Sequence, residues 1–486
     1  MVESGCADRP LLGAGDEMLT GADLARLARN GSSTIGRHQS LIYVGESHPH
    51  LPVALFAAAM AGVPYVPINY RLDDGQLSDL IARQPDPLVL TDASTASRVD
   101  GALVLDDWLA AIPADAPTPE PRFDDDEVAV VLYTSGTTSA PKAALLRHRH
   151  LMAYLLGSVE FASASPEETV LVAVPPYHVA GVANLLSNLF AGRRLVFLRS
   201  FDAQVWLDTV RTEQVTNAMV VPTMLARIVA ALDGAPADVP SLRTLSYGGA
   251  KVSERVLRAA IEAFPDTGFV NAYGLTETAS TIAVLGPDDH RAAMTSDDPA
   301  IRLRLSSAGK VLPNIEVDVR DELGAVVPAG ETGMLFLRGE QISGEYSTGS
   351  LLDDDGWFCT RDHGWLDSDG YLFIEGRADD TIIRGGENIA PAEIEEVLLA
   401  QPAVEEVCVV GVPDDEWGQR IEAAVVLRAG STASEADLRD AVRGVLRGSK
   451  TPDRIVFRSS LPHTDTGKML RRVVLQEMLD PTTASS

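Results

Sequence analysis

Short apolar runs alternate with amphipathic segments over much of the chain. Ser40–Val44 and Val63–Ile68 are largely apolar, which indicates buried strands, whereas Leu55–Ala61 and Gln76–Arg83 have helical spacing. The same alternation returns within Leu151–Thr278. This order predicts a parallel sheet covered by helices.

The pattern changes twice in the last third of the chain. From Ile315 to Leu337, short alternating strands with Gly and Pro turns predict a small β-rich subdomain. Beyond Gly376–Asp380 comes a compact segment with two helices and two strands: Pro391–Leu399, Val404–Val410, Ile421–Leu427 and Glu435–Leu446. We therefore expect an α/β protein with two domains. Residues 1–377 would form a large N-terminal domain of αβ layers plus the β subdomain, and residues 378–486 a small, mobile α+β domain.

One buried strand runs directly into a loop rich in hydroxyl groups. The apolar run that begins at Val128 is followed by Tyr133-Thr-Ser-Gly-Thr-Thr-Ser-Ala-Pro-Lys142. Backbone N–H groups and hydroxyls can converge on one point there, and the lysine adds a mobile cation, so the loop suits a polyphosphate. It is not a Walker A loop, because Pro141 and Ala143 replace residues that motif requires. A surface Ser/Thr loop is the alternative when the segment is taken alone.

Composition narrows the range of partners. The formal net charge of −29 argues against nucleic acid and against an anionic membrane surface. Leu51–Ile68 is uncharged over eighteen residues, but its prolines and Gly62 break it, so we expect no integral membrane segment. Cys6, Cys359 and Cys408 are too few and too scattered for a disulfide framework or a zinc site, and the N-terminus lacks a signal-peptide pattern. These features favour the cytoplasm.

Lysine is scarce in this chain. Of the 40 lysines and arginines, five are lysines, namely Lys142, Lys251, Lys310, Lys450 and Lys468. This bias toward arginine suggests a GC-rich bacterial genome. Each is therefore a stronger candidate for a chemical role than a lysine in a lysine-rich chain would be.

Six stretches occur in an order and spacing that resemble one superfamily. They are Tyr133–Lys142, Pro176–Gly181, Asn271–Glu277, Gly356–Gly364, Gly376–Ile389 and Leu461–Arg472. The chain resembles the adenylate-forming enzymes, which comprise acyl- and aryl-CoA synthetases, peptide-synthetase adenylation domains and firefly luciferase. The resemblance extends from about Leu19 to Arg472. Its C-terminal part is most similar to bacterial CoA ligases such as 4-chlorobenzoate:CoA ligase.

The resemblance implies a two-step reaction that uses ATP, Mg²⁺ and coenzyme A. A carboxylate attacks the α-phosphorus of MgATP and gives an acyl-adenylate and pyrophosphate. The thiol of CoA then displaces AMP. The partners would thus be a small-molecule carboxylic acid and CoA; whether the protein forms a homodimer is left open.

The resemblance also implies roles for individual residues in the first step. Lys468 would bridge the carboxylate and the α-phosphate, Thr276 would donate to that phosphate, and Glu277 would help to hold Mg²⁺. Nucleotide contacts are implied for Thr134, Ser135, Gly136, Thr137, Thr138, Lys142, Gly249, Ala250, Asn271, Ala272, Tyr273, Gly274, Asp362 and Arg377, the last two at the ribose. Taken singly, a Thr-Glu pair can be a helix cap, Asp362 a turn and Lys468 a solvated side chain.

For the second step, the small domain would rotate about Asp379. The resemblance then brings Gly386 toward the adenylate and packs Trp417 along the pantetheine of CoA. On its own, Asp379-Asp380 could be a surface turn.

The acyl pocket is expected around His178, which would lie beside the substrate carboxyl or else pack in the core. No carboxylate in Pro175–Gly181 is available to pair with an ammonium group, so the acid should not be an α-amino acid. The other expected pocket residues are mostly neutral and several are small: Val182, Thr223, Met224, Tyr247, Gly248, Gly249, Ala272 and Tyr273. They favour a hydrophobic acid, including bulky or cyclic ones.

Several features depart from the pattern or lie outside it. Ser139, Ala143, Arg361, His363 and Asp465 are unusual for the superfamily, although none removes an essential group. The pairs His48/His50 and His148/His150 have no cysteine or carboxylate cluster nearby in sequence, and we expect them to be solvated. Two other functions remain open. The acyl group could be transferred to a carrier protein, which a comparison of free CoA with a phosphopantetheinylated carrier would test. The protein could also bind a nucleotide without catalysis.

Overall fold

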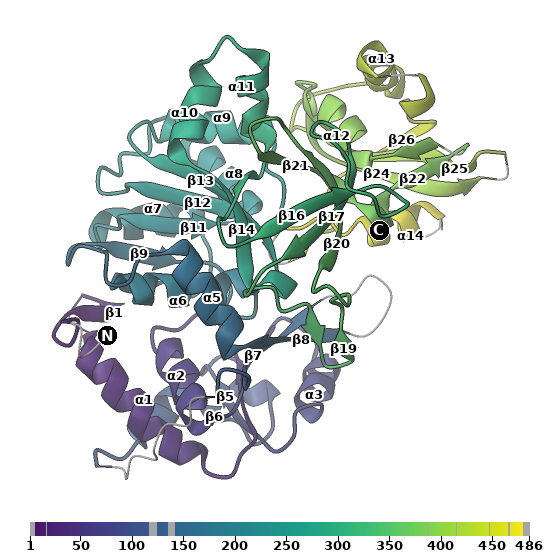
Figure 1. The fold of residues 1–486 in the computed structure, drawn as a ribbon. Helices are drawn as coiled ribbons and strands as arrows, with labels where there is room; N and C mark the ends of the chain where they lie inside the picture. Colours follow the sequence, from purple (N-terminus) through teal and green to yellow (C-terminus); the bar gives the residue numbers. More distant parts are fainter. Residues whose placement is uncertain are drawn as a thin grey trace.

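The computed structural model describes residues 5–15, 17–115, 124–134, 141–385, 387–414, 416–446, 448–464 and 467–479. A large N-terminal part carries two extended sheets, and a smaller C-terminal part, yellow-green in Figure 1, lies beside it. The predicted α/β architecture with a smaller C-terminal domain is confirmed.

The first sheet has eight strands in the order β19-β18-β8-β7-β4-β3-β5-β6. Its central pairings β7–β4, β4–β3 and β3–β5 are parallel, and β7–β8 is an antiparallel pair that flanks the predicted phosphate loop. The strands are β3 (Ser40–Val44), β4 (Tyr65–Ile68), β5 (Pro87–Thr91), β6 (Leu103–Val104), β7 (Val128–Thr134), β8 (Lys142–Arg147), β18 (Glu345–Tyr346) and β19 (Gly349–Ser350).

The second sheet has thirteen strands in the order β16-β17-β20-β21-β15-β14-β13-β12-β11-β9-β10-β1-β2. The segment β10-β9-β11-β12-β13 is parallel, while β14 and the strands beyond it pair antiparallel. The predicted β-rich subdomain is thus hydrogen-bonded to the main sheet through β14–β15. The strands are β1 (Pro10–Ala14), β2 (Glu17–Thr20), β9 (Thr169–Val172), β10 (Arg194–Phe197), β11 (Asn217–Val220), β12 (Thr244–Gly248), β13 (Gly268–Leu275), β14 (Ser280–Leu285), β15 (Gly309–Val311), β16 (Glu316–Arg320), β17 (Gly333–Arg338), β20 (Phe358–Leu366) and β21 (Tyr371–Arg377).

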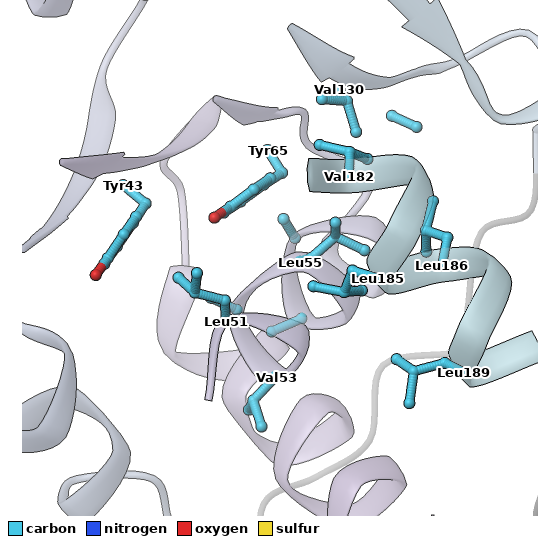
Figure 2. Close-up of a cluster of buried hydrophobic side chains, with 14 of the residues drawn as sticks. Tyr43, Leu51, Val53, Leu55, Tyr65, Val130, Val182, Leu185, Leu186 and Leu189 are labelled. Carbon is cyan, nitrogen blue, oxygen red and sulfur yellow. The ribbon is translucent and has the colours of Figure 1, made fainter. Parts of the chain in front are cut away.

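Helices cover both sheets, and one of them lies between the two. Apolar side chains of α6 share a core with Val130 of the first sheet and Val172 of the second. Figure 2 shows α6 residues, among them Val182 and Leu189, in this cluster with side chains of α2. The helices are α1 (Gly21–Ile35), α2 (Leu51–Ala61), α3 (Asp74–Ala82), α4 (Leu105–Ala110), α5 (His148–Ser158), α6 (Val179–Ala191), α7 (Ala203–Thr212), α8 (Pro222–Leu232), α9 (Glu254–Ala263), α10 (Pro287–Thr295) and α11 (Pro299–Leu303).

The uncharged run from residue 51 to 68 forms one helix and one strand, as expected. Pro52 stands in the first turn of α2, where its missing N–H costs nothing, and Gly62 ends the helix in a left-handed conformation at φ +69°. Within the described parts of the chain, no helix is both long enough and apolar enough to cross a bilayer.

The C-terminal domain is built on a three-stranded sheet with both faces buried. Val409 belongs to the core on one face and its neighbour Val410 to the core on the other, because successive residues of a strand point to opposite faces. The two covered faces explain why these strands read as continuous apolar runs. The elements are β22 (Ile382–Arg384), β23 (Glu387–Ile389), α12 (Pro391–Leu399), β24 (Val404–Asp414), β25 (Gly418–Leu427), α13 (Glu435–Val445), β26 (Arg454–Arg458) and α14 (Arg471–Leu479).

Candidate active site

The two ends of the predicted phosphate loop are joined as the base of a β-hairpin. Thr134 ends β7 and pairs in register with Lys142, which begins β8. The loop residues Ser135, Gly136, Thr137, Thr138 and Ser139 lie outside the described residues, as does Gly386. The hairpin holds Lys142 at the edge of the loop, with its Nζ 6.0 Å from the centre of the Tyr346 ring.

Tyr346 also fixes Glu277 beside this hairpin. The Tyr346 hydroxyl donates to Oε1 of Glu277, and the backbone N–H groups of Ser343 and Gly344 donate to the Glu277 carbonyl at 2.8 and 2.9 Å. Tyr346 is in β18, which pairs with β8, so this carboxylate lies on the same side of the molecule as Lys142. Burial, followed by the Glu277 charge, raises the pKa of Tyr346, which keeps its hydroxyl a donor.

Asp362 is 3% exposed and accepts a hydrogen bond on each of its oxygens. Tyr273 Oη donates to Oδ2 at 2.5 Å, and Arg377 Nη1 donates to Oδ1 at 3.0 Å. Two segments distant in sequence meet here, because Tyr273 is in β13, whereas Asp362 and Arg377 are paired residues of the consecutive strands β20 and β21. Each carboxylate oxygen keeps a second lone pair, so the group can still accept from two further hydroxyls.

Lys468 enters the same region from the C-terminal domain. Loss of hydration of the ammonium group, followed by the positive charge of Arg377, lowers the pKa of Lys468. The negative charges of Asp362, Asp380 and Glu277 act in the opposite direction. These charges come from both sides of the predicted domain boundary, so Lys468 lies where the two parts meet, although the residue as a whole is exposed to solvent. The adjoining Gly467 packs directly against Thr223 of the N-terminal part.

The predicted hinge residue Asp379 lies in a short turn, Ala378–Asp380, between β21 and β22. Arg361 Nη2 donates to its Oδ1 at 2.7 Å, and Arg471 Nε lies 3.5 Å from Asp380 Oδ2. Arg361, one of the departures from the superfamily pattern, therefore has a partner at the predicted hinge. A cavity of about 510 Å³ lies beside this turn.

Trp417 and the turn that precedes Gly386 lie together on the C-terminal domain. The backbone N–H of Gly385 donates to the Trp417 carbonyl at 2.8 Å, and a Cβ on Gly385 would meet the indole ring at 3.1 Å. The Trp417 residue is 46% exposed. Trp417 is thus open to solvent in the conformation in which Lys468 lies where the two parts meet.

The backbone is tightly constrained at two glycines in the strand ends that are predicted to meet the nucleotide or the acid. A Cβ on Gly274 would lie 1.8 Å from the carbonyl oxygen of Ser280, and one on Gly248 would lie 2.3 Å from that of Ala272. Glycine is required at both positions for close strand approach. Of the other predicted nucleotide residues in the strand ends, Gly249 is exposed and Thr276 and Ala250 are half-buried, while Asn271 Nδ2 donates to Ser307 O at 3.0 Å.

His178 stands at the N-cap position of α6 without a side-chain capping hydrogen bond, and a cavity of about 370 Å³ lies along this helix. The His178 ring is half-buried, with its centre 4.7 Å from that of Tyr177. The cavity separates α6 from the main sheet and includes Ala272 in its wall. It is the candidate acyl pocket.

Of the nine predicted pocket residues, Ala272 alone lines this cavity; His178, at the start of α6, does not. Val182 belongs to the core between the sheets (Figure 2), and Met224 to the core behind the main sheet. Tyr247 points away as well, and its hydroxyl lies 2.9 Å from Nε2 of buried His290. The cavity wall is formed instead by neighbours such as Ser246, because adjacent strand residues point to opposite faces. Thr223 contacts Gly467 rather than this wall.

The expectation that both histidine pairs are solvated is wrong for His48, which is 5% exposed. Its Nε2 lies 3.3 Å from Asp106 Oδ1, and His50 Nδ1 lies 3.9 Å from the same atom. The backbone N–H of His50 donates to Nδ1 of His48, so a neutral His48 carries its proton on Nε2, toward Asp106. A cation at Nε2 would require that proton on Nδ1, opposite another donor, and the arrangement fits a hydrogen-bonded pair better than a metal site.

The expectation is also wrong for His150, which is 3% exposed; His148 is half-buried. The backbone N–H of Arg147 donates to His150 Nδ1 at 3.2 Å at the start of α5. Burial lowers the pKa of His150 to about 4. His150 therefore acts as a neutral helix-capping group.

The residues missed by sequence reasoning are Tyr346 and the polar lining of the cavity. Nothing local in the sequence connects Tyr346 with Glu277. The lining did carry a signal, because Ala180, Ala183, Asn184, Ser187 and Asn188 follow helical spacing along an otherwise apolar helix.

Comparison with known proteins identifies the class to which this fold and site belong. Residues 6–347 match the AMP-binding enzyme family, and residues 393–468 match the AMP-binding enzyme C-terminal domain. The chain belongs to the AMP-binding enzyme family. Its resemblance to the adenylate-forming enzymes is thereby confirmed.

Similar proteins include ligases with two kinds of acceptor. The chain is 30% identical to indoleacetate–CoA ligase of Aromatoleum aromaticum over 92% of this chain and 89% of that protein. It is 33% identical to the fatty acid–[acyl-carrier-protein] ligase ScoC of Streptomyces coeruleorubidus over 88% and 85%. Among solved structures, ATP-bound MatB from Rhodopseudomonas palustris superposes with a TM-score of 0.86 at 27% identity, covering 98% of this chain and 97% of that one.

Proposed function

We propose that the protein is an acid–thiol ligase that joins a carboxylic acid to CoA through an acyl-adenylate, at the expense of ATP. The observation that carries this proposal is the meeting of Lys468 from the C-terminal domain with Asp362, Arg377 and Glu277 at one site. A non-catalytic nucleotide-binding protein has no need of a cation delivered from a second domain to a carboxylate-lined site.

In the first step, a carboxylate oxygen of the acid bonds to the α-phosphorus while the bond to the pyrophosphate breaks. Negative charge grows on the phosphate oxygens, so the Lys468 ammonium and the Thr276 hydroxyl would stabilise the transition state. Asp362 would accept from the ribose hydroxyls through its remaining lone pairs, beside Arg377. The loop closed by Thr134 and Lys142 would hold the outer phosphates, and Gly249, Ala250, Asn271, Ala272, Tyr273 and Gly274 the rest of the nucleotide.

The oxygen groups around Glu277 fit Mg²⁺. Its Oε1 accepts from Tyr346, which leaves Oε2 for a cation, and the Thr276 hydroxyl is adjacent in sequence. Carboxylate and hydroxyl oxygens are ligands that this hard cation accepts, together with phosphate oxygens and water. The ion would neutralise charge on the departing pyrophosphate.

In the second step, the CoA sulfur bonds to the acyl carbon and AMP leaves with the electrons of the broken C–O bond. We propose that the C-terminal domain, bounded at residue 378, rotates about Asp379 and exchanges Lys468 for Gly386 and Trp417. The exposure of Trp417 supports this proposal, because the side chain is free to meet CoA after rotation. Three free cysteines favour a reducing compartment, and we place the reaction in the cytoplasm.

Pyrophosphate release with MgATP tests the proposal. Purified protein is mixed with aryl, cyclic, medium-chain and long-chain acids, with and without CoA, and thioester is followed by mass. Acid-dependent release, with thioester only when CoA is present, is expected. Release with thioester only on a phosphopantetheinylated carrier protein would support the second candidate, which the similarity to ScoC favours. No release with any acid would contradict both.

A further inference from the structure

The cavity along α6 is lined by one face of that helix. Ala180, Ala183, Asn184 and Ser187 recur at the three- and four-residue spacing that places side chains on one face, and the opposite face carries the apolar residues of the core, including Val182 and Leu189 (Figure 2). From His178 to Asn184 is six residues, or about 9 Å along the helix axis. If His178 lies beside the substrate carboxyl, Asn184 lies well down the acyl group.

The facing wall is a set of strand residues in register. Met219, Ser246 and Val270 lie side by side on β11, β12 and β13, and Thr244 lies two residues further toward the strand beginnings. The cavity spans from Ala272, level with Gly248, to Thr244, about 13 Å at the rise of a strand. The space therefore suits a long acid rather than a short one.

A chain of hydrogen bonds fixes the orientation of the Asn184 amide. Arg193, which can only donate, bonds from Nε to Glu168 Oε2 at 2.7 Å and from Nη1 to Asn188 Oδ1 at 3.1 Å. The amide nitrogen of Asn188 must then face the other way, and it donates to Asn184 Oδ1 at 2.7 Å. Since Oδ1 of Asn184 accepts this hydrogen bond, the other end of the amide, Nδ2, is the donor that is still available.

That nitrogen is the unsatisfied end of the network. Asn184 is 7% exposed, and its Nδ2 is buried without a hydrogen-bond partner among the described residues. A buried donor without a partner costs about 1–3 kcal/mol, so such groups call for an explanation. Asn184 is part of the cavity wall, and an acceptor on a bound acid would satisfy it.

The charges of the network indicate a neutral acceptor. Arg193 is already paired with Glu168, so the cation near this end of the cavity is compensated. A second carboxylate on the acid would add an unpaired negative charge in a buried place, which is unfavourable. An ether, carbonyl or hydroxyl oxygen carries no net charge and would avoid this penalty.

We propose that Asn184 is a specificity-determining residue, and that the acid carries a neutral oxygen acceptor remote from its carboxylate, bound by the Asn184 amide. This rests on the proposed function and narrows its substrate class to elongated, oxygen-substituted acids. A simple hydrocarbon acid of the same shape leaves the Nδ2 group unsatisfied.

Matched acid pairs test the proposal. 4-Methoxycinnamic and 4-ethylcinnamic acids, with saturated and ring-extended pairs that differ in the same way, are compared by kcat/KM for pyrophosphate release. The wild-type protein should prefer the oxygenated member of its best pair by about 10-fold or more, the effect of one buried hydrogen bond. Equal rates, or a hydrocarbon acid as the best substrate, would overturn the proposal while leaving the ligase function intact. No release with any acid would overturn both.

The Asn184→Leu variant supplies a second readout. It conserves side-chain volume, removes the donor and should invert or abolish the preference within a pair, with the hydrocarbon member retained. Equal losses for both members would contradict a specificity role and indicate a structural one. If this variant does not fold, as judged by circular dichroism, the wild-type preference within matched pairs still decides the outcome.

Discussion

Gly467 lies so close to Thr223 that a Cβ atom on Gly467 would be 2.2 Å from both Cγ2 and Oγ1 of the threonine. The contact joins the loop that carries Lys468 to the first turn of α8 in the N-terminal domain. Gly467 also has φ +75°, a conformation that side chains disfavour. The loop can dock in this way because residue 467 has no side chain.

We expect Gly467→Ala to impair the first step selectively. The methyl group would clash with Thr223 and displace Lys468, so acid-dependent pyrophosphate release should fall about 100-fold, as for loss of a catalytic donor. Thioester formation from a supplied acyl-adenylate and CoA should change little, because Lys468 is not needed there. Gly444→Ala is the control, since a Cβ at that helical position meets nothing within 4 Å. Equal losses in both steps would contradict the two-conformation mechanism.

Removal of the lysine itself should be more severe for catalysis than for binding. Lys468→Ala is expected to lower adenylate formation by about 10²- to 10³-fold, because the cation acts on charge that develops in the transition state. The Kd for ATP, measured by calorimetry, should change only modestly. Lys450→Ala is a suitable control because Lys450 pairs with Glu393 within the C-terminal domain. Unchanged adenylate formation would exclude Lys468 from the mechanism.

The same lysine should set the alkaline limit of the first step. Its pKa is lowered at this site, so it loses its proton at a lower pH than a free lysine, and activity falls as pH rises through that value. The kcat/KM profile for pyrophosphate release without CoA should therefore decline at a lower pH than the ordinary pKa of a lysine would set. The Lys468→Arg variant should retain some activity but lack this alkaline decline, because arginine stays protonated throughout the pH range of the assay. An identical decline in the arginine variant would assign the titration to another group.

Tyr346→Phe should weaken Mg²⁺ use without affecting the fold. The change removes the hydroxyl that orients Glu277, and loss of such a supporting hydrogen bond at a metal site typically costs about 10- to 100-fold in apparent metal affinity. The measurement is the Mg²⁺ dependence of pyrophosphate release at saturating ATP. Tyr371→Phe is the matched control, because Tyr371 donates to Asp289 at 2.6 Å instead. An unchanged Mg²⁺ dependence would separate Glu277 from the metal.

His150 should make the protein less stable in mild acid. The folded state holds the pKa of His150 at about 4, below the value near 6.5 of an unfolded histidine, so the unfolded chain binds a proton more readily between these values. The free energy of unfolding should therefore be unaffected by this group above pH 6.5 and fall by up to about 3 kcal/mol as the pH drops toward 4.

His150→Gln tests this assignment. Glutamine can accept from the Arg147 N–H at the same capping position but does not titrate. Urea unfolding of the variant should show a shallower decline between pH 6.5 and 4 than the wild type. An equal decline would assign the acid sensitivity to other groups.

The sequence by itself determined the features that are written locally. The alternation of apolar runs predicted Ser40–Val44 as a strand and Pro391–Leu399 as a helix with the bounds that the structure has, because period and turn residues act over short distances. The ordered motifs pointed to the family and to Asp362, Arg377, Glu277 and Lys468, which the fold brings together. The sequence also predicted two domains, because the change of hydrophobic pattern after residue 376 is itself a local feature.

The tertiary structure alone decided which face of each element meets the substrate. Tyr247 and Ser246 are neighbours, and both faces of β12 are covered, so no polarity pattern tells which residue lines the cavity. The contacts of Tyr346 with Glu277 and of Gly467 with Thr223 span 69 and 244 residues respectively and follow from sheet order and domain docking. The buried states of His48 and His150, and the free amide of Asn184, likewise depend on what packs against them.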